Sequence, residues 1–409
     1  MSTEGSGTAG PRGSGAIARG LFPPGNAAGG ALVNRESEYR RLIDDVVAGR
    51  SAWFDCPQRY GVSTLINRAC QDLRHWREPR MAIADCRLHS IHDTESFCVT
   101  MLEAMGQLAS QVIRRANVLP DNVANLFTGV TKEIYLDVNH LQTIRLHPGE
   151  RPLDTLLEVH TELDQMALQR GCRCVLIVRE LQQLPALRSS KQLTQAMHSM
   201  IDSNRAFVWL MHGHNRSVMR SLFEGSKAPL HGRCRRFALR PINSETYSDY
   251  LGAAAQARWQ CNIGVKAREM IVALTDRHPR WLNELCRRLW SADLPPVIQD
   301  VVNEWYALVD ENRHVTGREL ERLSPNQRAV LYCLAQTPTD KPRAKRFVAR
   351  TRVSSASVGQ AIRILEELDL ICADAAGRWT VSDPVMQWSL HPRTDIVDEI
   401  YELGPDIRW

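Results

Sequence analysis

Five short apolar runs, separated by longer amphipathic segments, mark the first 240 residues of the chain. The runs are Ala52–Cys56, Met81–Cys86, Cys172–Val178, Ala206–Met211 and Arg236–Leu239. Strands that are apolar on both faces are typical of a parallel sheet covered by helices. The segment from Glu36 to Gly49 has apolar residues at helical spacing and ends in glycine. The pattern therefore predicts an α/β fold built on a parallel sheet.

The rest of the apolar pattern is mostly helical. An insertion from about 93 to 169 separates the second and third runs, and we expect helices there, interrupted near Pro120 and at Leu146–Pro152. Residues 243–320 are expected to form a small helical lid domain. The sheet would then belong to a first domain at 32–242, with a separate unit at 321–390.

The unit at 321–390 has the element order of a winged helix. A first helix is predicted over Ser324–Ala335, where a serine cap precedes a proline. Lys345–Arg352 would form a second helix and Ser354–Leu368 a third. Leu370–Cys372 and Arg378–Val381 would pair as a hairpin wing.

The two ends of the chain have unusual compositions. Residues 1–30 contain nine glycines and three prolines, and such a segment buries too little apolar surface to offset the entropy of ordering. We therefore expect a disordered arm over 1–31. The tail at 391–409 is acidic, with five acids against two arginines.

The loop after the first predicted strand has part of a phosphate-binding motif. Such a loop needs glycine where the backbone folds around phosphates, a lysine for the β and γ oxygens, and a hydroxyl for magnesium, all at a helix N-terminus. In CPQRYGVSTL, which begins at Cys56, Gly61 and the hydroxyls of Ser63 and Thr64 are in register. Cys56 replaces the first glycine and Val62 replaces the lysine. The loop is a degenerate Walker A motif.

The third predicted strand should end in an aspartate that holds magnesium and a glutamate that polarises the attacking water. It ends instead in Arg179 and Glu180. An arginine at the metal-holding position puts a cation where a dication must bind, which is worse than the loss of a ligand.

Five segments carry a resemblance to a known family: PPGNAAGGALVNRESE, CPQRYGVSTL, VLIVREL, MHGHNRSVMRSLFEGSKAPLHGR and LTDRHPRWLNEL. In this order they resemble the AAA-related and STAND-like prokaryotic P-loop ATPases with a C-terminal winged helix, and also the archaeal replication initiators. The resemblance covers about 20 to 390. Three residues depart from the family pattern: Val62, Arg179, and Asn34 in place of a glycine.

The resemblance implies roles for particular residues. Arg35 and Glu36 would flank the adenine, and Glu180 would act on the water. The phosphates would lie at Gly61, Ser63 and Thr64. Because the lysine and the aspartate are both missing, we expect a pseudo-ATPase. Three outcomes stay open, namely no nucleotide binding, binding of ATP or ADP without hydrolysis, and slow hydrolysis with substitute residues.

The overall charge of +5 is only mildly basic, so its distribution matters more than its sum. Residues 341–352 contain six cations and no acid. If the third helix of the winged helix enters a major groove, its outward face and this basic run would contact double-stranded DNA. A solvated face, or a contact with protein, is the alternative. The candidate DNA-binding residues are Lys341, Arg343, Lys345, Arg346, Arg350, Arg352, Ser354, Ser355, Ser357, Gln360, Arg363 and Arg378.

The 11 cysteines are scattered through apolar segments and form no C-x-x-C pair. This usage is typical of reduced thiols and predicts a cytoplasmic protein. A metal site is not expected, because Cys86, His89 and His92 lack a fourth ligand, and Cys172 and Cys174 fit a buried strand. No apolar run is long enough to span a membrane, and no leader is expected.

These observations favour a DNA-binding, non-hydrolysing ATPase homologue. It would act as a structural or regulatory subunit of a nucleic-acid machine, such as a mobile-element or antiphage-defence complex, with protein partners in a homo- or hetero-oligomer. One alternative is a nucleotide-sensing regulator that binds ATP and controls transcription or a partner effector. The other is a slow ATPase.

Overall fold

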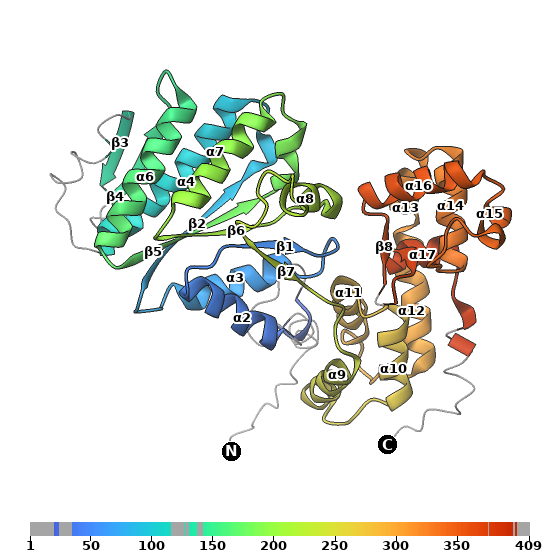
Figure 1. Ribbon diagram of the computed structural model, residues 1–409. Coiled ribbons are helices and arrows are strands. Elements are labelled where there is room, and N and C mark those ends of the chain that lie inside the picture. Colours follow the sequence, from blue (N-terminus) through green and yellow to red (C-terminus); the bar gives the residue numbers. More distant parts are fainter. Residues whose placement is uncertain are drawn as a thin grey trace, which may run out of the picture. The chain divides into compact units, whose positions relative to one another are not determined.

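The computed structural model describes residues 20–23, 35–115, 127, 131–136, 142–374, 376–395 and 397–398. They form two compact units (Figure 1). The α/β unit consists of Ser37–Gln58 and Leu65–Leu239. The lid and winged-helix unit consists of the described residues of Met1–Glu36, Arg59–Thr64 and Arg240–Trp409.

Five parallel strands form the sheet of the α/β unit, in the order β2-β5-β6-β1-β7 (Figure 1). Every residue of β1 and of β6 is buried, as expected for strands covered on both faces. The predicted α/β fold with a parallel sheet is confirmed. The strands are β1 (Ala52–Asp55), β2 (Arg80–Arg87), β5 (Cys172–Arg179), β6 (Phe207–Met211) and β7 (Arg235–Ala238).

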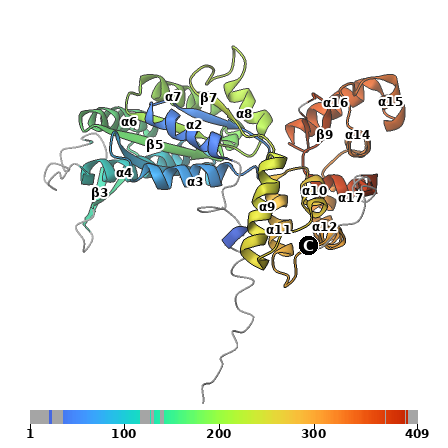
Figure 2. The same cartoon turned by 90° about the horizontal axis from the view of Figure 1, so that it is seen from below.

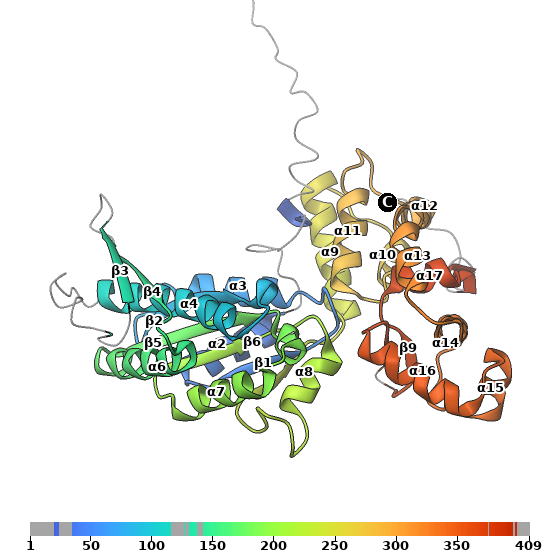
Figure 3. The same cartoon turned by 90° about the horizontal axis from the view of Figure 1, so that it is seen from above.

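Helices lie on both faces of this sheet. Figures 2 and 3 show α3 and α4 on one face and α7 on the other. Short 3-10 helices, Leu88–Ser90 and Leu181–Ala186, follow β2 and β5. The helices are α2 (Glu36–Val47), α3 (Val62–Leu73), α4 (Thr94–Arg115), α6 (Pro152–Gln169), α7 (Ser190–Ser203) and α8 (Arg216–Phe223).

The insertion differs from its sequence-based prediction. Between α4 and α6 the chain forms an antiparallel hairpin of β3 (Thr131–Leu136) and β4 (Gln142–His147), so the expectation of an all-helical insertion is wrong. The hairpin packs on α4 through small residues. A Cβ on Gly106 would lie 2.4 Å from the carbonyl oxygen of Ile144, and the Ile144 N–H donates to the Ser110 hydroxyl at 2.9 Å. This long-range docking has no signal in local periodicity.

The lid is helical, as predicted. Its helices are α9 (Ser244–Trp259), α10 (Val265–Leu274), α11 (Pro279–Leu289), α12 (Ile298–Glu311) and α13 (Arg313–Glu321). Buried tryptophans and leucines form its core, among them Trp281 and Leu285 of α11, Trp290 directly after α11, and Trp305 of α12.

A short N-terminal segment, Gly20–Pro23, packs in that core. Phe22 is only 1% exposed, and its ring contacts those of Tyr250 and Trp290 at centroid distances of 5.7 and 4.9 Å. The Tyr250 hydroxyl donates to the Leu21 carbonyl at 2.7 Å. The predicted disordered arm over 1–31 is therefore wrong at these four residues, because one large aromatic side chain stabilises what glycine content alone would leave unordered. Residues 1–19 and 24–31 lie outside the described residues.

The C-terminal elements confirm the predicted winged-helix order, with α14 (Pro325–Gln336), α15 (Lys345–Thr351), α16 (Ser355–Glu367), β8 (Ile371–Ala373), β9 (Trp379–Val381) and α17 (Pro384–Leu390). The serine cap predicted before the proline of the first helix is present, and Ser324 and Gln327 also bond reciprocally as a capping box. An isolated antiparallel bridge from Thr339 to Trp379 adds to the three residue pairs of the β8–β9 wing. Most of the acidic tail, from 399 onward, lies outside the described residues.

Candidate functional site

The loop after β1 has two backbone features that a phosphate-binding loop needs, a glycine with positive φ and a helix that begins directly after it. Gly61 has φ +87°, a conformation that favours glycine, and α3 begins at the next residue. Val62 occupies the lysine position and is only 4% exposed, so its side chain packs inward and brings no charge. Thr64, which carries one of the two hydroxyls in register, is also buried. The N-terminus of α3 is left as the anion-attracting feature.

Residues distant in sequence lie against this loop. The Arg35 guanidinium donates to the carbonyl oxygen of Tyr60 at 3.4 Å, and the Tyr60 ring lies edge-on to His278 at a centroid distance of 4.9 Å. Arg35, assigned by resemblance to the adenine side, is buried here, whereas Glu36 begins α2 and is exposed.

Two further arginines that sequence reasoning missed belong to the same unit. Burial, followed by the charge of Arg59, lowers the pKa of Arg280. Arg280 also lies over the Trp281 ring, 4.5 Å from its centroid. Arg280 belongs to the segment RHPRW, which carries part of the resemblance, but the resemblance implies no role for this residue. These cations could partly replace the charge of the missing lysine.

Arg179, at the end of β5, is built into the α/β unit. It is 7% exposed, and its Nε donates to the Asp85 carboxylate of β2 at 2.6 Å. Its Nη2 donates to the side-chain oxygen of Asn67 on α3 at 3.0 Å. A guanidinium therefore occupies the end of the strand where a metal-holding carboxylate would be expected. The residues present do not fit a magnesium ion.

The Glu180 side chain also contacts neighbouring residues. Its backbone is left-handed, with φ +61°, and its carboxylate lies 2.7 Å from Nε2 of His214 and accepts from the Gln182 amide at 2.6 Å. His212 directly follows β6. Its pKa is lowered to about 3, mainly by burial and further by the nearby His214 and Arg179. His212 is therefore neutral at pH 7.

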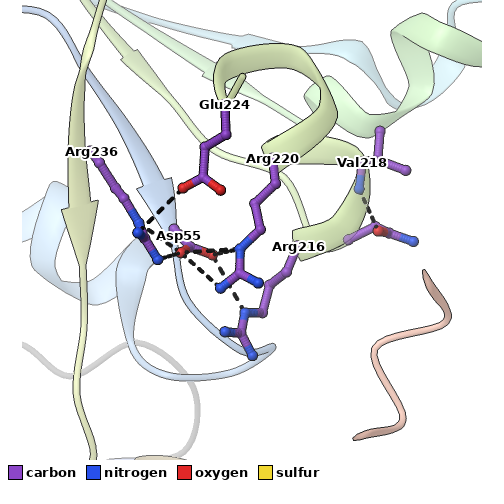
Figure 4. A network of polar contacts seen from close by, with 7 residues as sticks. Asp55, Arg216, Val218, Arg220, Glu224 and Arg236 are labelled. Atoms are coloured by element: carbon purple, nitrogen blue, oxygen red, sulfur yellow. Dashed lines mark hydrogen bonds and ion pairs between the residues drawn. The ribbon is translucent and has the colours of Figure 1, made fainter. Parts of the chain in front are cut away.

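A buried carboxylate at the end of β1 was not predicted as a site residue. Asp55 is 1% exposed by side chain and pairs with Arg216 and Arg220 of α8 and with Arg236 of β7 (Figure 4). Burial alone would raise the pKa of Asp55, but the hydrogen bond from Arg220 and the three positive charges lower it below its usual value. Figure 4 also shows Glu224 paired with Arg236. This cluster joins three elements at the same edge of the sheet.

The candidate DNA-binding residues are grouped on α15, α16 and the preceding loop, but their settings differ. Lys345, Arg346 and Arg352 are exposed, as are Ser355 and Gln360. By contrast, Ser354 caps α16 by accepting from the Ser357 N–H, so it is structural.

Several of the candidate cations have partners within the unit. Arg350 donates to Gln336 and Thr337 at 2.9 and 2.7 Å, and Arg378 pairs with Asp374 at 2.8 Å. Lys341 and Arg363 have longer contacts of 3.9 Å with Asp340 and Glu367. The basic run is therefore not uniformly available to phosphates.

The described part of the chain contains no group of three or more histidines, cysteines or acids arranged to hold a metal ion. All 11 cysteines are free thiols, and Cys172 and Cys174 are buried on β5, as the sequence indicated. Over the same described ranges, no helix combines the length and apolar character needed to cross a membrane.

No model of a protein family matches the chain, and no curated protein matches it. Solved structures do. The Walker-type ATPase PABY2304 of Pyrococcus abyssi has a TM-score of 0.64 at 17% identity, over 90% of this chain and 98% of its own. The ORC2 protein of Aeropyrum pernix, in ADPNP–ADP complexes, has a TM-score of 0.52 at 13% identity, over 94% of this chain and 98% of its own. The chain has the fold of the AAA+ P-loop ATPases, with a helical lid and a C-terminal helical region.

Proposed function

We propose that the chain is a DNA-binding AAA+-like protein that does not hydrolyse ATP. It would serve as a structural or regulatory subunit of a nucleic-acid-associated machine. The observation that carries the proposal is the buried guanidinium of Arg179, which is bonded to Asp85 and Asn67 at the end of β5.

Phosphoryl transfer depends on positioning and on the neutralisation of charge by magnesium and lysine. Arg179 offers no oxygen ligand, and at about 4 Å it would repel a cation by about 4 kcal/mol per unit charge at an effective dielectric of about 20. Val62 is buried and uncharged. Both electrostatic contributions are therefore missing.

The DNA-binding part rests on the winged helix. Its α16 has exposed polar residues along one face, and α15 presents Lys345 and Arg346. For these two cations and Arg352, no acidic partner is found among the described residues. Cations without partners are suited to contact phosphates.

The first test is ATP turnover by the purified full chain with magnesium. We expect phosphate release no higher than that of the Glu180→Gln variant, and no gain from Val62→Lys, because Arg179 would still disfavour the metal. Turnover by the wild type that disappears in Glu180→Gln would contradict the proposal.

The second test is the salt dependence of binding to duplex DNA. Each phosphate contact contributes about 0.9 to the slope of log K against log salt. We expect the double change Lys345→Ala and Arg346→Ala to lower the slope by about 2.

The matched control removes two other exposed cations of the same unit, Arg313 and Arg322, which pair with Asp310 and Glu319 on the lid side. Alanine at both should leave the slope unchanged. Equal effects of the two double variants would point to a general charge effect and would count against a winged-helix interface.

Nucleotide binding without turnover is a second candidate, favoured by the backbone of Gly61 and by the cations Arg59 and Arg280. The ORC2 structure contains nucleotides. If this candidate is correct, labelled ATP should bind equally well with and without magnesium, and Arg280→Ala should weaken that binding. Absence of binding would leave a protein with no nucleotide role.

A further inference from the structure

A glycine lies in the interior of α16, where alanine would make a more favourable helix. Gly359 is four residues past the start of this helix, between the buried Val358 and Ala361. Its φ lies outside the left-handed region, so the backbone itself would accept any residue. Backbone conformation therefore does not account for the glycine, and its neighbours have to be considered.

The space at Gly359 is filled by Arg343. A Cβ added to Gly359 would lie 2.4 Å from Nη2, 2.7 Å from Nε and 2.8 Å from Cζ of Arg343. The guanidinium of Arg343 thus rests directly on the helix. Arg343 comes from the loop before α15 and is exposed.

The guanidinium also lies on the face that would read DNA. Residues four apart on a helix share a face, so Gly359 is aligned with Ser355 and Arg363, which are both exposed. Within the described residues, no acceptor or acidic partner binds Arg343, unlike Arg350 and Arg378. Its donors remain free for a ligand.

We infer that Gly359 positions Arg343 across α16 as a residue that reads guanine in the major groove. An arginine fork matches O6 and N7 of guanine with two hydrogen bonds. The inference rests on the proposed DNA-binding function and assigns Arg343 a role in sequence preference, not in general phosphate contact. Gly359 is the positioning residue.

The experiment uses the full chain and a pool of randomised DNA duplexes. The sequence most enriched by the wild type is compared with a scrambled duplex of the same composition, with binding followed by fluorescence anisotropy. The variants are Arg343→Ala, Arg343→Lys, Gly359→Ala and the double change Arg343→Ala with Gly359→Ala.

We expect Arg343→Ala and Gly359→Ala each to weaken binding to the enriched duplex by about 10-fold, with little effect on the scrambled duplex. The double variant should bind like Arg343→Ala alone, because both changes remove one contact. Arg343→Lys keeps the charge but loses the fork, so it should also lose the preference.

Gly359→Ala should nevertheless raise the melting temperature, because alanine favours the helix. The matched control is Gly317→Ala in α13, where a Cβ would meet nothing within 4 Å. This control should raise stability in the same way and leave DNA binding unchanged. Reduced binding in a more stable protein cannot be attributed to misfolding.

Three results would overturn the inference while leaving DNA binding in place. They are no enrichment of any sequence, wild-type binding by Gly359→Ala, and equal losses by Arg343→Ala on both duplexes, which would make Arg343 a phosphate contact. If the wild type binds no duplex at all, the proposed function fails and this inference fails with it.

Discussion

The guanidinium of Arg179 joins three elements of the α/β unit, because it comes from β5, pairs with Asp85 on β2 and donates to Asn67 on α3. A buried charge is tolerated when it is paired and hydrogen-bonded. At the residue scale, the charge at the end of β5 is thus held in a structural ion pair that links β5, β2 and α3.

Removal of one partner of the Arg179–Asp85 ion pair should destabilise the α/β unit. We expect Asp85→Ala to lower the free energy of unfolding by about 1–3 kcal/mol, less than the roughly 3–5 kcal/mol of a fully buried pair, because the Asp85 side chain is 33% exposed. Arg179→Ala combined with Asp85→Ala should cost less than the sum of the single changes. Urea unfolding measures all three variants.

Arg87→Ala provides the control, since Arg87 also pairs with Asp85, at 3.5 Å, but is 67% exposed. It should cost at most about 1 kcal/mol. Additive effects of the Arg179 and Asp85 changes would show that the pair contributes no coupling.

At the scale of elements, Asp55 connects β1 to α8 and β7 through three arginines (Figure 4). The buried carboxylate partly neutralises the three arginines, so the packing of β1 against α8 and β7 depends on its negative charge. Glu224 supplies a second acid through Arg236. The cluster is therefore expected to make this edge of the sheet sensitive to acid.

We expect Asp55→Asn to lower the free energy of unfolding by about 2–4 kcal/mol near pH 7, since three arginines lose their shared anion while staying partly solvated. The pKa of Asp55 is lowered in the folded state. The charge of Asp55 therefore adds stability above the unfolded pKa of about 3.9, and this contribution is lost as the pH falls through the lower folded pKa.

The difference between wild type and Asp55→Asn should thus be constant from pH 7 to about pH 5 and decrease below about pH 4. Denaturant unfolding across this range measures it. A difference that stays constant down to about pH 3 would show that the pKa of Asp55 is not lowered in the fold.

At the scale of the whole molecule, the N-terminal segment belongs to the lid. Phe22 packs with Tyr250 and Trp290, and the Pro23 carbonyl accepts from the Asn283 amide at 2.7 Å. The first and the last thirds of the sequence thus contribute to one hydrophobic core. The segment Gly20–Pro23, which composition assigns to a flexible arm, is thus a structural part of the lid and winged-helix unit.

We expect Phe22→Ala to destabilise the lid and winged-helix unit by about 3–5 kcal/mol, because the change leaves a cavity among large aromatic rings. Removal of residues 1–19, chosen for its glycine-rich composition, should have little effect. Calorimetry of the full chain distinguishes the two variants. A neutral Phe22→Ala would mean that the segment does not remain docked in solution.

The local pattern of apolar and polar residues was sufficient to predict much of this fold. The doubly buried strands, the helical lid and the order of the winged helix follow from periodicity and capping residues, which act over a few neighbouring positions. Val62 and Arg179 were assigned to Walker positions from their places in the chain, Val62 at the start of α3 and Arg179 at the end of β5. This assignment stays a prediction.

Tertiary structure alone decided the rest, because these features depend on residues far apart in sequence. The β3–β4 hairpin forms on Gly106 and Ser110 of α4, and Phe22 is ordered by rings more than 200 positions away. Similarly, six cations in one run look alike in sequence, yet Arg350 is bonded to Gln336 while Arg343 rests on Gly359. Periodicity records which face of an element is buried, whereas the partner on that face is set only when the chain folds.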